Sequence, residues 1–127
     1  MNSEDLKNRF KQFAYRTARA CGTLKRDTTS QIISKQLLRS AFSSAANYRS
    51  ATRSQSKRQF LAKLNIALEE IDESTFWLEA LKDLELIPHE KLNLLIEESV
   101  ELTKILSASK NTVRKNINQS SIKDHKS

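Results

Sequence analysis

The chain has 127 residues, and Leu, Ile, Val and Phe make up about a quarter of it, enough for the core of one small domain. It contains one Gly and one Pro, too few for the turns of a typical β-protein, so the composition favours long helices. No apolar run approaches the ~18 residues of a membrane span, and the first ten residues lack a signal-peptide pattern. We therefore expect a cytoplasmic protein without a membrane partner.

Charge is distributed unevenly along the chain. Residues 1–63 carry 14 Lys and Arg against 3 Asp and Glu, whereas residues 64–127 carry 8 against 12. The two halves therefore have formal net charges of +11 and −4, which give the total of +7. A separation of this size implies a directional electrostatic field around the folded protein.

Two helices are predicted in the basic half. Apolar side chains at three- and four-residue spacing indicate a helix from about residue 4 to 22, with Ser3 as its N-cap and Gly22 in a left-handed C-terminal position. Cys21, near its end, lies among small residues and suits a core position better than a nucleophile's. A second helix runs from about residue 30 to 51, and its candidate caps are Thr28, Thr29 and Ser30.

Two more helices are predicted in the acidic half. The third, from about residue 55 to 85, approaches a heptad repeat, and its second apolar flank indicates contact with two neighbours. Ser54 or Ser56 is expected to cap it. Pro88 suits the first position of a fourth helix.

The fourth helix is expected to fray after about residue 116. Short links between long helices force antiparallel neighbours, so the sequence predicts an all-α, antiparallel up-down-up-down four-helix bundle. This bundle domain would cover residues 1–116, followed by a flexible polar tail over residues 117–127.

Residues 43–81 carry a dense signature, SSAANYRSATRSQSKRQFLAKLNIALEEIDESTFWLEAL. This stretch resembles the four-helix-bundle proteins associated with 23S rRNA intervening sequences, and the order of helices agrees with that family over about residues 4–115. The resemblance implies the protomer of a homopentamer, and some members are encoded inside extra segments of 23S rRNA genes. A distant branch of similar fold comprises accessory proteins of diversity-generating retroelements, which partner a reverse transcriptase.

Basic residues form the first candidate site. Arg49 and Arg53 are four residues apart and share a helix face. Cations on a rigid element can contact phosphates, and binding gains from counterion release. Structured RNA or a nucleoprotein is therefore an expected partner, contacted by Arg16, Arg19, Arg39, Arg49, Arg53, Lys57, Arg58 and Lys63. The competing interpretations are a solvated helix surface and Arg–Glu pairing within or between subunits.

Acidic residues of the third predicted helix form the second candidate site. Glu69 and Glu73 share a helix face, but metal sites in four-helix bundles also need Glu-x-x-His motifs, and His89 and His125 lack that spacing. We therefore expect no metal and no cofactor. Glu69 and Glu73 are assigned instead to ion pairs within a subunit or at an interface, because buried carboxylates need partners.

Three further residues are assigned structural or interface roles. Asn47, beside Ser43 and Ser44, forms a polar cluster that can fix helix register through hydrogen bonds. Tyr48 lies on the apolar stripe of its helix. Trp77 could stack on a base, but on a heptad helix it suits a core or interface position better.

The sequence matches none of the common catalytic motifs. One Gly excludes a phosphate-binding loop, and two poorly placed His residues give no Ser-His-Asp arrangement, so no catalytic residue is assigned. The sequence favours a non-enzymatic, basic homo-oligomer associated with RNA or nucleoprotein. The alternative is a protein-interaction scaffold or accessory subunit, for example of a reverse transcriptase, without direct nucleic-acid contact. A metal- or small-molecule-binding bundle is a weaker third hypothesis.

Overall fold

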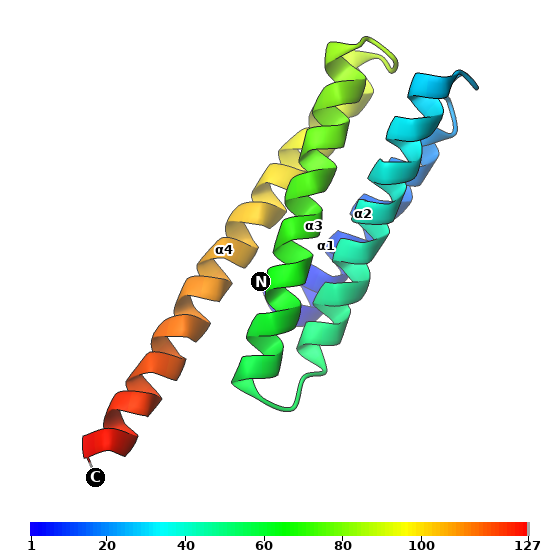
Figure 1. Cartoon of the computed structure of the whole chain (residues 1–127). Coiled ribbons are helices and arrows are strands. Elements are labelled where there is room, and N and C mark those ends of the chain that lie inside the picture. Colours follow the sequence, from blue (N-terminus) through cyan, green and yellow to red (C-terminus); the bar gives the residue numbers. More distant parts are fainter. Residues whose placement is uncertain (127) are drawn as a thin grey trace.

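The computed structural model describes the backbone of residues 1–126 and the side chains of residues 1–120. Within this part the chain forms four α-helices and no β-strand: α1 (Ser3–Cys21), α2 (Thr28–Thr52), α3 (Lys57–Asp83) and α4 (His89–Lys126). Consecutive helices run antiparallel and are joined by short turns (Figure 1). Helix α2 contacts α1 and α3, and α4 contacts α3 and α1. The prediction of an all-α four-helix bundle is confirmed, whereas the number of subunits stays a prediction.

Helix α1 begins with a capping box. The Oδ1 atom of Asn2 accepts a hydrogen bond from the Asp5 backbone N–H at 2.9 Å, and the Asp5 carboxylate accepts one from the Asn2 N–H at 3.4 Å. Two N–H groups that the helix leaves unpaired are thereby satisfied. The predicted cap, Ser3, is wrong because the residue before it supplies the better-placed acceptor.

The next two helices are also capped by side-chain oxygens. Asp27, rather than one of the three residues that follow it, caps α2 by accepting from the Ser30 N–H at 2.8 Å. These hydrogen bonds hold the pKa of the Asp27 carboxyl below its usual value, because they favour the charged form. Ser56 caps α3 by accepting from the Gln59 N–H at 3.1 Å, as predicted.

The left-handed residue of this bundle is not its glycine. Gly22 has a φ of −62°, so the left-handed position predicted for it is wrong. Glu85, after α3, has a φ of 56°. There the Leu86 N–H donates to the Leu81 carbonyl at 2.9 Å, and the Glu85 N–H donates to the Lys82 carbonyl at 3.0 Å. This pattern is a Schellman motif, which normally places Gly where this chain has Glu85.

The core fills the space between all four helices. It contains Phe residues from α1 and aliphatic residues from the other three helices, all fully or almost fully buried: Phe10, Phe13, Leu37, Leu64, Ile71, Leu78, Leu92, Leu102 and Leu106. Two buried hydroxyl pairs cross the interior, Ser40 with Ser74 and Thr75 with Ser99, each at 2.8 Å between oxygens. They join α2 to α3 and α3 to α4 without leaving the hydroxyls unpaired.

Helix α4 continues to Lys126, beyond the predicted end near residue 116. Among the described side chains of α4, Leu106 is the last buried one, and the C-terminal part of the helix extends past the other three helices (Figure 1). The predicted helix end is wrong because residues 107–126 contain no Gly or Pro that would stop the backbone ladder. The flexibility predicted for residues 117–127 stays a prediction, and side chains from 121 onward lie outside the described part. No helix in the described residues is long and apolar enough to cross a membrane.

Cys21 lies at the end of α1 and is partly buried against the core. Burial raises the pKa of its thiol to about 11, because desolvation disfavours the thiolate. The side chain is thus poorly suited to nucleophilic chemistry near neutral pH, where the thiolate is the reactive form.

We predict that replacing Glu85 with Gly will stabilise the protein. Gly adopts a positive φ without the steric cost that a Cβ imposes, although it also raises the entropy of the unfolded chain. The free energy of unfolding of Glu85→Gly should rise by up to about 1 kcal/mol in chemical denaturation. Glu79→Gly, at an exposed position inside α3, is the matched control and should lower it by about 1 kcal/mol. Equal losses in both variants would contradict the Schellman assignment.

We also predict slow modification of Cys21. With a thiol pKa of about 11 instead of 9.0, the thiolate fraction at pH 8 falls on the order of a hundredfold. The native protein should therefore react far more slowly with a disulfide reagent such as Ellman's reagent than the same protein in guanidinium chloride. Equal rates in the two states would show that the thiol is not protected by burial.

Candidate nucleic-acid interface

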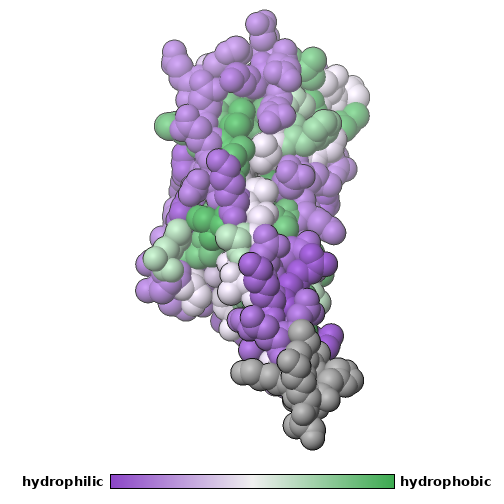
Figure 2. Space-filling view, turned by 90° about the vertical axis from the view of Figure 1, so that its left-hand side faces the viewer, coloured by the Kyte–Doolittle hydropathy of each residue, from purple (hydrophilic) through white to green (hydrophobic). Residues whose placement is uncertain are grey.

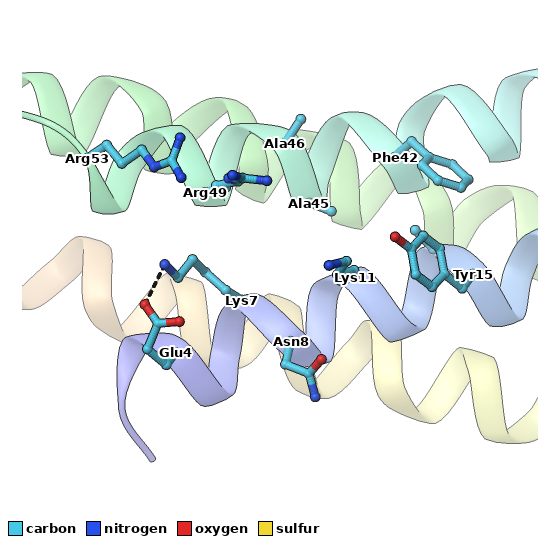
Figure 3. Close-up of a pocket in the computed structure, with 11 residues that line it drawn as sticks. Glu4, Lys7, Asn8, Lys11, Tyr15, Phe42, Ala45, Ala46, Arg49 and Arg53 are labelled. Atoms are coloured by element: carbon cyan, nitrogen blue, oxygen red, sulfur yellow. Dashed lines mark ion pairs between the residues drawn. The ribbon is translucent and has the colours of Figure 1, made fainter.

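A groove of about 610 Å³ lies between α1 and α2. Figure 3 shows residues of both helices along its two sides. The lining is mainly basic, aromatic and small: Glu4, Lys7, Asn8, Lys11, Ala14, Tyr15, Phe42, Ala45, Ala46, Arg49 and Arg53.

Helical periodicity builds both sides of the groove. On α1, Lys7, Lys11 and Tyr15 recur every four residues and therefore share a face. On α2, Phe42 and Arg49 lie two turns apart on the side that faces α1. Because the helices are antiparallel, the α2 arginines lie opposite the start of α1, and Phe42 lies beside Tyr15 (Figure 3). Small side chains between these positions leave room for the hollow.

Charge in the groove is only partly compensated. The Lys7 ammonium lies 2.5 Å from the Glu4 carboxylate, which is mostly solvent-exposed. Lys11, Arg49 and Arg53 are exposed and have no carboxylate partner among the described residues. Three uncompensated cations therefore line one groove, and such an arrangement suits an anionic ligand.

The other end of the groove is aromatic. Tyr15 is 38 % exposed and Phe42 is 43 % exposed, and their ring centroids lie 6.1 Å apart with planes inclined at 43°. By contrast, the buried rings of Phe10 and Tyr48 stack at 5.1 Å with planes only 21° apart. The groove thus combines cations at one end with two accessible ring surfaces at the other.

Arg39 lies elsewhere and is already paired. Its guanidinium donates to the Glu70 carboxylate at 3.0 Å and also bonds Glu73, so it joins α2 to α3. Arg9 similarly joins α1 to α4 through two contacts with Glu98, at 3.1 and 2.5 Å. The hydrogen-bonded Glu98 carboxylate raises the pKa of the Arg9 guanidinium. Both arginines serve the Arg–Glu pairing that the sequence offered as an alternative to phosphate contact.

The remaining cations of the predicted set are spread over the bundle. Arg16 lines a shallow hollow between α1 and α4 whose other members are Leu94, Glu97, Glu98 and Glu101. Arg19 is exposed in the last turn of α1. Three residues are exposed in the first turns of α3, at the end of the bundle where Arg53 lies: Lys57, Arg58 and Lys63.

The structure brings Arg49 and Arg53 together with four residues that the sequence analysis did not single out, Lys7, Lys11, Tyr15 and Phe42. A signal for the α1 members exists in the sequence. Lys7, Lys11 and Tyr15 repeat at i, i+4 and i+8, on a side of α1 different from its apolar stripe. The sequence does not indicate that the face of α1 with Lys7, Lys11 and Tyr15 lies beside the face of α2 with Phe42, Arg49 and Arg53.

The residues assigned to structural or interface roles occupy the following positions. The Asn47 amide donates to the carbonyl and the hydroxyl of Ser43, at 2.9 and 3.1 Å, within α2. Tyr48 is buried in the core, and this burial raises the pKa of its phenol. Trp77 is half-buried and packs edge-on against Phe76 at 4.9 Å.

The acidic positions form no metal-binding group. Glu73 is engaged by Arg39, whereas Glu69 is exposed on α3. Among the side chains that the structure describes, no cluster of three or more His, Cys, Asp or Glu residues could hold a metal ion. His125 lies outside those side chains.

Comparison with known proteins identifies the family of the chain and a solved structure of similar fold. The family of 23S rRNA-intervening sequence proteins matches residues 5–108. A crystal structure of a protein with unknown function from the S23 ribosomal protein family of Bacteroides thetaiotaomicron is 35 % identical, with a TM-score of 0.79. The match covers 87 % of this chain and 99 % of that one. No curated protein matches with significance. The protein therefore belongs to the family of 23S rRNA-intervening sequence proteins.

Proposed function

We propose that this protein is a non-enzymatic, RNA- or nucleoprotein-associated binding protein that acts as a basic homo-oligomer and contacts RNA through the α1–α2 groove. One observation carries the proposal. Lys11, Arg49 and Arg53 line the groove without carboxylate partners among the described residues, whereas Arg9 and Arg39 are engaged by Glu side chains. The family's association with 23S rRNA intervening sequences is consistent with an RNA partner.

Phosphate contact explains this arrangement of charge. Cations that neutralise phosphates release condensed counterions, and the resulting affinity does not depend on sequence. Arg also donates in a planar fork that matches phosphate oxygens, so Arg49 and Arg53 are suited to hold a backbone in a fixed position. The sequence contains no known RNA-reading motif, and phosphate and shape should therefore dominate recognition.

We predict that RNA affinity falls steeply with salt and depends on the groove arginines. A labelled rRNA hairpin is titrated with the protein by fluorescence anisotropy across a salt series. In Arg49→Glu/Arg53→Glu the affinity should collapse at low salt, and the slope of log affinity against log salt should shrink by about two. Both side chains are exposed, so the helical circular dichroism signal should not change.

The matched control is Lys25→Glu/Arg26→Glu, which makes the same change in net charge in the exposed α1–α2 turn, at the end of the bundle away from Arg53. It should weaken binding far less than the groove variant. Equal losses in the two variants would show that net charge alone, and not the groove, attracts RNA. No binding by the wild type at low salt would overturn the RNA proposal.

A protein-interaction scaffold is the second candidate function, and exposed apolar side chains favour it. Phe76 is 59 % exposed on α3 and Leu94 is 61 % exposed on α4. Figure 2 shows the face on the α4 side, where hydrophobic residues gather in separate patches among hydrophilic ones. Such residues are suited to contacts with other copies or with a partner such as a polymerase.

We expect the wild type to form a homo-oligomer, with the family resemblance pointing to five subunits. Light scattering after size exclusion measures the mass at several concentrations. Phe76→Glu should shift the mass toward that of the monomer, because a charge at an apolar interface loses its solvation. Lys82→Glu makes a larger charge change on the same helix, two units instead of one, and should still leave the mass unchanged. A monomeric wild type would contradict the oligomer, whereas an oligomer without RNA affinity would favour the scaffold.

A further inference from the structure

We infer that the Tyr15–Phe42 ring pair is a stacking site for an unpaired base, so that the α1–α2 groove takes a single-stranded segment of nucleic acid. This inference rests on the proposed RNA-binding function and adds the form of RNA and the residues that hold its base. The ring pair would hold a base while Lys11, Arg49 and Arg53 hold the backbone beside it.

The exposure of the two rings is the first argument. Phe42 and Tyr15 keep 43 % and 38 % of their surfaces in water, although the Phe10–Tyr48 pair shows that aromatic residues of these same two helices can be buried. The 43° inclination and the 6.1 Å separation mean that the rings do not cover each other face to face. A base inserted against them would bury apolar surface that the free protein leaves exposed.

The placement of the cations is the second argument. Lys11 is one helical turn, about 6 Å along α1, from Tyr15. On α2, Arg49 and Arg53 lie about 10 and 16 Å along the axis from Phe42. The backbone of a nucleic acid whose base lies on the rings can therefore meet Lys11 near that base, and Arg49 and Arg53 farther along the groove (Figure 3). An exposed patch of lysines and arginines without rings would supply the charge but no contact for a base.

The space between the rings and the arginines is the third argument. Ala45 and Ala46 line this stretch, and their methyl groups leave the groove open between the larger side chains (Figure 3). A duplex keeps its bases stacked inside and presents phosphates and sugars, so it could reach the cations but not cover the rings. A single strand can use both ends of the groove at once.

The test measures the affinities of three anionic probes for the wild type and for Tyr15→Leu/Phe42→Leu. This variant keeps large apolar side chains but has no rings at these positions. The probes are labelled oligouridylate, a blunt RNA duplex with the same number of phosphates, and inorganic polyphosphate as a competitor. A labelled poly-glutamate peptide is the control anion without phosphate. We expect the wild type to bind oligouridylate more tightly than the duplex. The variant should lose affinity for oligouridylate on the order of tenfold, while competition by polyphosphate changes less than about twofold. Tyr15→Phe retains a ring and should bind like the wild type.

Other results would overturn the inference in distinct ways. Unchanged affinity of the double Leu variant for oligouridylate, or an equal loss for polyphosphate, would show that the rings do not stack on bases. Stronger binding of the duplex by the wild type would exclude a single-strand site. If the poly-glutamate peptide bound to the wild type but not to the double Leu variant, and oligouridylate bound to neither, the groove would be a site for a protein partner. If the wild type bound none of the three nucleic-acid or phosphate probes, the RNA proposal itself would fail.

Discussion

A buried hydrogen bond between Ser40 and Ser74 joins α2 to α3, the two central helices of the bundle, and both helices carry further small buried side chains. Ser40, Ala41 and Ser44 of α2 are fully buried, as are Ala67 and Ser74 of α3. Small residues let two helix backbones approach closely, but their hydroxyls then lose contact with water and need partners. The Ser40–Ser74 hydrogen bond at 2.8 Å meets this need between the helices, and the Ser44 hydroxyl donates to the Ala41 carbonyl within α2. With the central pair held closely, α1 packs on α2 and α4 packs on α3.

Ion pairs between the two halves of the chain determine which cations remain available. Arg39 reaches from α2 to carboxylates of α3, and Arg9 reaches from α1 to Glu98 of α4. Both pairs are partly exposed, so each adds at most about 1 kcal/mol to stability, and their larger effect is on the distribution of charge. Where α1 faces α2, both sides come from the basic half, and Glu4 is the one acidic residue in the groove lining. The uneven charge of the sequence thus becomes a groove with excess positive charge.

The helices and their core residues could be predicted because they depend on periodicity within one segment. The groove could not be predicted, because it depends on which faces of two separate helices meet. The stripe of α3 predicted a core helix, and Leu64, Ile71 and Leu78 are all fully buried. Arg49 and Arg53 could be assigned to one face because they belong to one helix. Lys7 and Tyr15 could not be joined to them, because nothing in either segment states which faces of α1 and α2 meet. Local details failed for a related reason. Asn2 and Asp27 cap helices for which neighbouring Ser or Thr residues looked equally suitable or better, and Glu85 has the left-handed backbone that was predicted for Gly22 at the end of another helix.

Two alanines of the groove lining also take part in the packing of the core. Ala14 is buried in it, with 1 % of its surface exposed, and Ala45 is partly buried against it. Most of the other lining residues are exposed, so they can change with little effect on the packing that holds the helices together. Folding and binding are therefore encoded by nearly separate sets of residues, which overlap at these two alanines. A larger side chain at Ala14 would fill the groove and strain the core together, whereas the exposed lining positions leave the bundle free to acquire a different ligand.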